Sequence, residues 1–225
     1  MPGVLVNVAT VLLGSLLGLV CKRGIPEKIT KSMTTAVALA VVYIGIDGMM
    51  GGEKTLVLIL SLVLGGVIGT VLNLDHYLER LGQSVERKFK LRKDVSIAEG
   101  FISATLLFCV GAMTVVGALR SGLSGDHEMQ YTKATLDFIS SIVLASTLGF
   151  GVMLSSVSVL VIQGSITLFA SFLAPYLSQV VIAEMTCVGS VLILALALNL
   201  LGVTKIKLMN YAPAIFLPIL LCRFL

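Results

Sequence analysis

The sequence predicts an all-α integral membrane protein, a single domain over residues 1–225 that crosses the bilayer seven or eight times. Composition is the first indication: 57% of the residues are hydrophobic and 12% are charged, against ~45–50% apolar and ~25% charged in soluble domains. The second is that apolar runs near the ~20 residues needed to span a bilayer recur along the whole chain. The third is that glycines interrupt several of these runs.

The apolar runs place the membrane helices in chain order. We expect them at about residues 3–21, 33–50, 55–74, 97–119 and 180–201, with two more crossings inside 134–176. A turn near Ser155 and Ser156 would separate those two. The first run is a retained helix, because it lacks the basic leader and cleavage site of a signal peptide. The last run, 213–225, reaches only ~20 Å at ~1.5 Å per residue, so it forms a re-entrant half-helix or a shortened eighth crossing.

An internal repeat of helix pairs is a further expectation. Residues 61–69 and 141–149 share Ser, Val, Leu and a closing Gly, and the glycine pairs of the second and fourth helices have the same spacing. Some transporter folds are built from such repeats. Apolar sequence of low complexity also gives such matches by chance, so both interpretations stay open.

The segment 75–96 is the one sizeable polar stretch, and we expect it to form an amphipathic helix on the cytoplasmic membrane surface. Apolar residues recur in it at near-helical intervals among basic ones, which suits a helix lying among lipid headgroups. A helical connector surrounded by water is the alternative. Five basic residues are the predicted contacts with anionic lipid: Arg87, Lys88, Lys90, Arg92 and Lys93.

The distribution of basic residues predicts the orientation. With the N-terminus outside and seven crossings before the tail, the cytoplasmic connections hold most of the chain's 16 Lys and Arg residues. Cytoplasmic loops are enriched in Lys and Arg, so this orientation is the expected one. The outer side keeps four basic residues: Lys54, Arg120, Lys133 and Arg223.

Three helices carry small residues one turn apart, and these predict close helix contacts. Helices in lipid associate where small side chains let their backbones approach. We expect such faces to hold the scaffold together or to join copies of the chain in a homo-oligomer. The pairs are Gly14 with Gly18, Gly65 with Gly69, and Ala145 with Gly149.

Several long motifs carry a family resemblance that covers essentially the whole chain. They include AEGFISATLLFCVGAMTVVGALRSGLSGDH, KATLDFISSIVLASTLGFGVMLS and EMTCVGSVLILALALNLLGVTKIKLMNYAPAI. These runs resemble the bacterial membrane protein family catalogued as domain of unknown function 554. The resemblance implies a multi-pass protein of the bacterial inner membrane and suggests a sodium channel or pump, with no established site. Asp47 is not part of the sequence pattern on which this resemblance rests.

Gln163 is the first candidate for an ion pathway, because it lies in the middle of the apolar run VLVIQGSITLF. An amide with no partner in hydrocarbon costs several kcal/mol, so this side chain must face protein or water. Ser165 and Thr167 add hydroxyl oxygens, and neutral oxygens suit a small hard cation that sheds its water. An interhelical hydrogen bond that holds the bundle together is the alternative.

The run FCVGAMTVVG, residues 108–117, is the second candidate, because Gly111 and Thr114 lie in the middle of an expected helix. Glycines there favour a kink or break, and broken helices at the midplane expose carbonyls that bind ions in transporters. Close helix packing through glycine is the alternative.

Acidic and amide side chains complete the expected pathway. Asp137 is the strongest of the carboxylates at helix starts, because Ser141 shares its face of the helix, although such carboxylates also compensate the helix dipole. Asp47 is either a cation attractor or a solvated helix end, because charges are costly near the midplane and cheap near the interface. Asn199, in LALALNLLG, is either a pathway residue or a packing hydrogen bond.

These observations favour transport of a small ion or solute, sodium first, through glycine-broken helices lined by neutral oxygens. The alternative is a non-transporting organiser that binds lipid or a partner through its basic segment. The sequence carries no HExxH, GxSxG or P-loop motif and no GxGxxG placed after a strand, so we expect no enzyme. The four cysteines lack metal-ligand spacing. A sodium ion is the one cofactor candidate, and the bilayer, not nucleic acid, is the expected partner.

Overall fold

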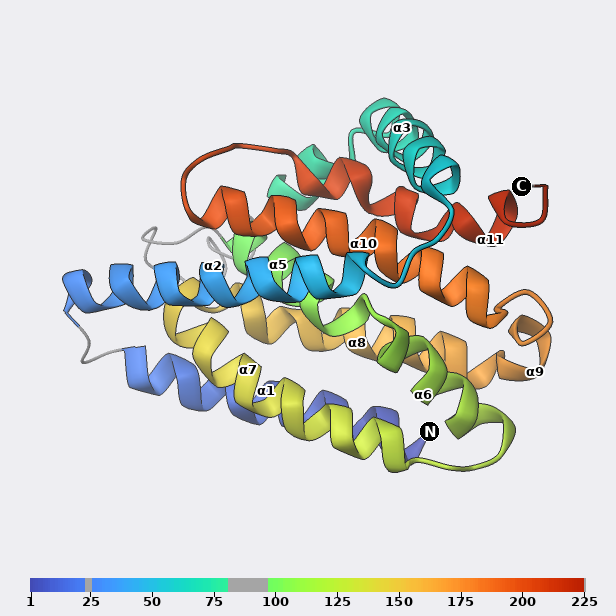
Figure 1. Ribbon diagram of the computed structural model, residues 1–225. Helices are drawn as coiled ribbons and strands as arrows, with labels where there is room; N and C mark the ends of the chain where they lie inside the picture. Colours follow the sequence, from blue (N-terminus) through green and yellow to red (C-terminus); the bar gives the residue numbers. More distant parts are fainter. Residues whose placement is uncertain (23–25, 81–96, 225) are drawn as a thin grey trace.

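The computed structural model describes residues 1–22, 26–80 and 97–224, and this part of the chain is helical without strands. Figure 1 shows most of the helices running side by side along one common direction. The helices are α1 (Pro2–Lys22), α2 (Glu27–Met49), α3 (Thr55–Val71), a short helix at Leu74–Arg80, α5 (Ile97–Cys109), α6 (Ala112–Leu123), α7 (Glu128–Leu148), α8 (Gly151–Leu168), α9 (Ala170–Leu173), α10 (Gln179–Leu200), the 3₁₀ helix η1 (Leu208–Phe216) and α11 (Pro218–Leu221).

Four helices in the described residues are long and apolar enough to cross a membrane: α1, α2, α8 and α10. The number rises to six if two bent pairs each form one span, namely α3 with Leu74–Arg80, bent by 52°, and α5 with α6, bent by 61°. The predicted membrane class is therefore confirmed. The count of seven or eight crossings stays a prediction, since α7 carries charged side chains and Leu208–Leu221 is a shorter apolar segment.

The turn between α7 and α8 corrects the predicted position of this boundary. It falls at Gly149 and Phe150, not at Ser155 and Ser156. Gly149 has a φ of 78°, which favours glycine and ends α7. The two serines lie inside α8, where their hydroxyls donate to carbonyls three residues earlier, at 2.6 and 2.8 Å. Serine is therefore satisfied inside the helix, and the glycine sets the turn.

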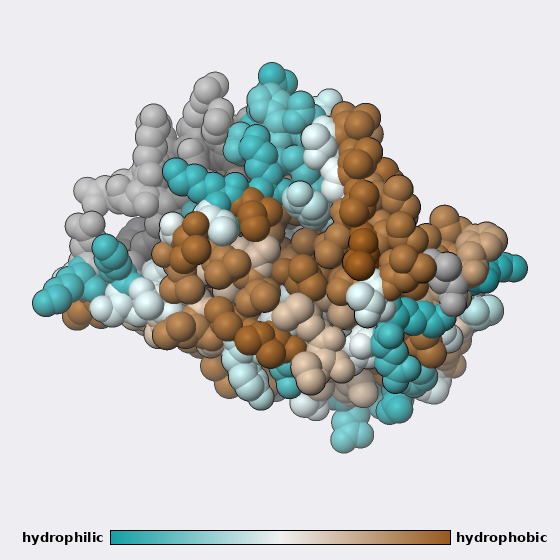
Figure 2. Space-filling view, turned by 45° about the horizontal axis from the view of Figure 1, so that its top comes forward, coloured by the Kyte–Doolittle hydropathy of each residue, from teal (hydrophilic) through white to brown (hydrophobic). Residues whose placement is uncertain are grey.

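The helices present apolar side chains outward, as expected in lipid. On α1, Val4, Asn7, Val11 and Gly18 are buried, whereas the leucines between them are exposed. This is the one-sided burial of a helix that faces neighbours on one side and lipid on the other. Figure 2 shows hydrophobic residues gathered over the middle of one face, with hydrophilic residues toward its ends.

Two ends of the bundle can be told apart in Figure 1. The α1–α2 and α10–η1 connections lie at one end, which carries Lys28, Lys31, Lys205 and Lys207, and we call it the basic end. The α2–α3 connection and the α6–α7 loop lie at the opposite end. The N-terminus-outside orientation stays a prediction. The lipid-contact residues of the segment 75–96 lie outside the described residues: Arg87, Lys88, Lys90, Arg92 and Lys93.

The small residues on α1 lie against α7. A Cβ built at Gly14 would overlap the carbonyl oxygen of Phe138, and one at Gly18 would overlap that of Ile142 and approach Ala145. Backbones this close leave no room for a side chain. Ala145 therefore lies in the α1–α7 contact, while Gly149 lies at the turn that follows.

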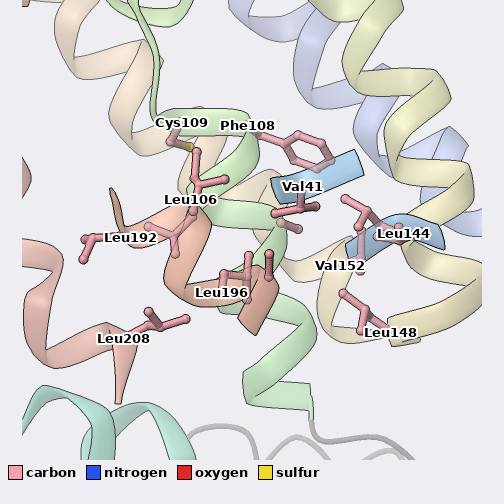
Figure 3. Packing of buried hydrophobic residues seen from close by; sticks show 14 of the residues in the cluster. Val41, Leu106, Phe108, Cys109, Leu144, Leu148, Val152, Leu192, Leu196 and Leu208 are labelled. Carbon is pink, nitrogen blue, oxygen red and sulfur yellow. The ribbon is translucent and has the colours of Figure 1, made fainter. Parts of the chain in front are cut away.

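The small residues on α3 lie against η1. A Cβ at Gly65 would overlap the backbone of Ala214, and one at Gly69 would overlap the backbone of Asn210. The main apolar core lies between α2, α5, α7, α8 and α10, where Figure 3 shows side chains such as Val41, Phe108 and Leu144 packed together.

Candidate functional site

Polar side chains from α1, α7 and α8 meet inside the bundle. Asn7 comes from α1, Lys133 and Asp137 from α7, and Gln163 from α8, and each is at most 6% exposed. Gln130 shares this face of α7, one turn before Lys133, and is 2% exposed. We call these five residues the polar cluster. Ionisable residues in the interior of a membrane protein are rare, and by default they indicate a functional site.

Lys133 and Asp137 form a buried ion pair. The Lys133 Nζ lies 2.9 Å from Asp137 Oδ1 and 2.7 Å from Oδ2, so the ammonium contacts both carboxylate oxygens. The pair is placed by the helix itself, because residues four apart are neighbours on one helix face. Removing the charges from water costs several kcal/mol per ion, so this pair is weak evidence for stability. A functional reason for retaining it is therefore worth seeking.

Asn7 joins the ion pair to α8. Its Nδ2 donates to Asp137 Oδ2 at 3.0 Å and to Gln163 Oε1 at 3.2 Å. An amide group has two hydrogens, so both bonds form together. The Asn7 side chain on α1 thus binds one oxygen from α7 and one from α8. Both oxygens lie within hydrogen-bond distance of its Nδ2 atom.

Three buried atoms of the polar cluster have no hydrogen-bond partner among the described residues: Nε2 of Gln163 and both amide atoms of Gln130. Outside the polar cluster the same holds for Oγ of Ser15, Oγ of Ser61 and Oε2 of Glu184. Leaving one buried donor or acceptor unsatisfied costs ~1–3 kcal/mol. The polar cluster differs from the other places in combining two such amides with a charged pair.

The structure separates the other pathway candidates on α7 and α8. Thr167 is buried and donates to the Ala118 carbonyl of α6 at 3.2 Å, so it ties α8 to α6. Ser141 is buried, donates to its own helix at Phe138, and lies against Gly14. Ser165 is exposed and bonds only within α8, so it does not join the polar cluster.

The glycine-broken helix adjoins the polar cluster. Gly111, between α5 and α6, has a φ of 129° and a ψ of 150°, a conformation that side chains strongly disfavour. Thr114 donates its hydroxyl to the Phe108 carbonyl at 3.1 Å, across the break. Farther along α6, a Cβ built at Gly117 would lie 3.4 Å from Cγ of Gln130. The helix that starts at the break therefore packs against the Gln130 side of the polar cluster.

A cavity of about 230 Å³ opens on another side of the same break. Gly111 lines it with mainly apolar side chains of α5, α8, α10 and η1, including Ile162, Met185 and Ile215. A Cβ at Gly111 would meet nothing within 4 Å. The break at Gly111 therefore lies at the wall of this cavity.

The remaining candidates lie away from the polar cluster. Asp47 is exposed near the end of α2. Asn199 organises the loop after α10, since its Nδ2 donates to the Ile206 carbonyl at 2.8 Å and its Oδ1 accepts from the Ile206 amide at 2.9 Å. Glu184 is 1% exposed, and one of its carboxylate oxygens accepts from the backbone amides of residues 53 and 54, each at 2.8 Å. Glu184 thus holds the α2–α3 connection.

Sequence reasoning placed three members of the polar cluster elsewhere or passed over them. Lys133 was expected in an outer loop because the apolar run starts at Ala134, but α7 starts at Glu128 and buries this lysine. Asn7 and Gln130 were not among the residues proposed for the pathway. The available signal was a polar stripe at helical spacing on α7, formed by Gln130, Lys133, Asp137 and Ser141.

The donor set of the polar cluster suits a hard cation and not a soft metal. It offers the two oxygens of Asp137 and the amide oxygen of Gln163, which are oxygen ligands only. Asn7 presents its Nδ2 to these oxygens, whereas its Oδ1 accepts from the Thr10 hydroxyl at 3.5 Å. Nowhere in residues 1–22, 26–80 and 97–224 do three or more His, Cys, Asp or Glu residues gather as metal ligands.

Comparison with known proteins identifies relatives along nearly the whole chain. The sequence model of the family described as "Protein of unknown function (DUF554)" matches residues 2–223. The "Uncharacterized membrane protein YdfK" of Bacillus subtilis (strain 168) is 33% identical over 222 residues, which cover 97% of this chain and 94% of the relative. The "Uncharacterized protein YqgA" of Escherichia coli (strain K12) is 29% identical over 219 residues, covering 96% and 93%. No solved structure matches the chain.

Proposed function

Because this chain belongs to the DUF554 family of membrane proteins of unknown function, we propose a function from its own polar cluster: transport of a small cation, sodium first, across the bilayer. Asp137 provides the negative charge, and the amide oxygens of Gln163 and Asn7 replace part of the cation's water shell. The chain acts as a transporter and not as an enzyme.

The observation that carries this proposal is the buried Lys133–Asp137 pair with unsatisfied amides around it. Burying a charged pair and unsatisfied polar atoms inside a membrane protein costs free energy. Such groups are therefore rare, and where they occur they usually belong to a functional pathway. Structural hydrogen bonds alone would be expected to leave no amide atom without a partner. Gln130 and Gln163 depart from that rule at the same place.

The break at Gly111 is a second observation that supports the proposal. Broken membrane helices provide free backbone groups and helix-end dipoles at cation sites in transporters. Here the break starts α6, which packs against Gln130 of the polar cluster at Gly117, and it borders a cavity that gives α6 room to move. Movement of α6 about Gly111 is the step that would open the polar cluster toward one end.

Flux through purified protein in liposomes tests the proposal. Sodium influx is followed with a fluorescent indicator, and Asp137→Asn and Gln163→Leu are each expected to lower it at least tenfold. Ser165→Ala is the matched control, because Ser165 is a polar residue of the same helix that is exposed and outside the polar cluster. Either cluster variant conducting sodium like the parent would show that the pathway is wrongly placed.

A further inference from the structure

We propose that Lys133 is a built-in competitor of the transported cation, so that a monovalent metal cation binds Asp137 only when the Lys133 ammonium leaves. This inference rests on the proposed function and adds the class of ion and the way its binding is controlled. It is carried by the ammonium contacting both oxygens of the single carboxylate in the polar cluster.

The first argument is geometric. The Nζ of Lys133 lies 2.9 and 2.7 Å from the two oxygens of Asp137, and Asn7 Nδ2 lies 3.0 Å from Oδ2. A metal cation needs these same oxygens at still shorter distance, ~2.3–2.6 Å for an ion of calcium size. The ammonium and the metal cation therefore exclude each other from one place.

The second argument is charge. Among the described residues, the polar cluster contains one carboxylate and one ammonium, so its formal charge is zero. A cation that binds while the ammonium stays on Asp137 would put two positive charges on one carboxylate, and such charges repel each other strongly where little water screens them. With the ammonium moved away from Asp137 to Gln130, a monovalent cation takes its place on the carboxylate and leaves the polar cluster with one positive charge in excess. A divalent cation would leave two in excess, and buried excess charge is costly, so the monovalent cation is the favoured occupant.

The third argument is that a second place for the ammonium exists. Gln130 lies three residues before Lys133 on the same helix face, and residues three apart are neighbours. Its Oε1 is buried, has no partner among the described residues, and lies against Gly3 of α1. Glycine at position 3 makes the space that this amide occupies. The Lys133 side chain can therefore turn from Asp137 toward an acceptor that is otherwise unused.

The remaining ligands follow from the existing contacts. Asn7 Nδ2 already holds Asp137 Oδ2 and Gln163 Oε1 around one point. Rotation of the Asn7 amide exchanges its donor for its oxygen, so that oxygens from α1, α7 and α8 can surround one cation. Each of these three helices contributes one side chain.

Equilibrium binding to the purified, detergent-solubilised protein tests the inference. The thermal midpoint is measured against NaCl and LiCl, with choline chloride keeping the ionic strength constant, and the half-saturating concentration is read from the curve. Lys133→Gln should lower that concentration at least tenfold, because the competitor is gone. Lys133→Arg should raise it, because a guanidinium binds a carboxylate through two parallel bonds and leaves it less readily. Asp137→Asn should remove the response.

Two further variants serve as controls. Lys28→Gln makes the same chemical change at an exposed lysine of α2 and should leave the curve unchanged. Gln130→Leu removes the second acceptor and should weaken sodium binding with Asp137 and Lys133 intact. If Lys133→Gln does not fold, Lys133→Arg and Gln130→Leu decide the question.

The outcomes separate this inference from the proposed function. Equal or weaker sodium binding by Lys133→Gln, or unchanged binding by Lys133→Arg, would overturn the competition while leaving measured flux untouched. A larger response to CaCl₂ than to NaCl would overturn the monovalent class. A parent protein that carries no cation in liposomes would instead overturn the proposed function itself.

Discussion

The α1–α7 contact and the α3–η1 contact are built alike and differ in what lies beside them. In both, glycines one turn apart let two backbones approach until no side chain fits between them, at Gly14 and Gly18 in one and at Gly65 and Gly69 in the other. Close approach of this kind holds helices together where lipid offers apolar side chains no preference for each other.

The two contacts differ in their polar groups. The α1–α7 contact continues into the polar cluster through Asn7, two turns before Gly14. At the end of the α3–η1 contact, Asn210 Oδ1 accepts from the amide of Asp75 at 2.9 Å. Ser61 of α3 has a buried hydroxyl oxygen without a partner among the described residues, but the unpartnered buried amides and the buried ion pair of these residues lie in the polar cluster. The comparison indicates that glycine contacts make the scaffold, whereas unsatisfied amides and a buried ion pair distinguish the functional region.

The largest effect is expected from breaking the ion pair on the α1–α7 side. Lys133→Leu leaves the Asp137 carboxylate buried and unpaired, which should lower the free energy of unfolding by ~3–5 kcal/mol. Denaturant unfolding of the detergent-solubilised protein measures this. The double variant Lys133→Leu with Asp137→Leu should recover most of the loss, since no buried charge remains. A single variant as stable as the parent would contradict burial of this pair.

The variant Gly69→Leu should disrupt the contact between α3 and η1. The added side chain would overlap the Asn210 backbone, and overpacking costs typically ~1–3 kcal/mol. Unfolding should register the loss, while sodium flux per folded molecule stays at the parent level. Val67→Leu, at a side chain of α3 that is 56% exposed, is the control and should change neither. A selective loss of flux in Gly69→Leu would erase the distinction between scaffold and functional region.

The break between α5 and α6 gives an effect of intermediate size. Gly111→Ala forces a side chain into a backbone region used almost only by glycine, at ~1–3 kcal/mol, although the space around its Cβ is open. Both stability and flux should fall, because the helix that starts at the break packs against the polar cluster. Gly51→Ala, in the α2–α3 connection, is the control, because its φ is not in the left-handed region and its Cβ would meet only the Gly48 carbonyl oxygen, at 4.0 Å. Equal behaviour of the two variants would remove backbone strain as the reason for Gly111.

The variant with the smallest expected change in stability, Gln163→Leu, is the most direct test of the comparison. Gln163→Leu loses one hydrogen bond to Asn7, and such bonds in membrane proteins average ~0.6 kcal/mol, while it also removes an unsatisfied Nε2 atom. Its unfolding free energy should therefore stay close to that of the parent, although its sodium flux falls. Measuring both quantities on one preparation separates a pathway residue from a packing residue. Loss of both in equal proportion would favour packing.

The success and failure of the sequence analysis follow the same physics. Gln163 and Asp137 could be proposed from sequence because a polar side chain within an apolar run must find a partner, wherever the run folds. Lys133 could not be placed, because its burial depends on the ion pair with Asp137, and because α7 starts at Glu128, before the apolar run. Asn199 looked similar to Gln163 in sequence, yet it organises a loop.

The sequence by itself determined the membrane class, the approximate position of most helices, the small residues suited to close contacts and the short list of polar groups that need partners. These properties are local, because hydrophobicity and helix spacing act over one or two turns. The tertiary structure decided which groups meet. Asn7 bonds to Gln163 across 156 residues of chain, and such a meeting follows from how α1, α7 and α8 pack, which no single segment specifies.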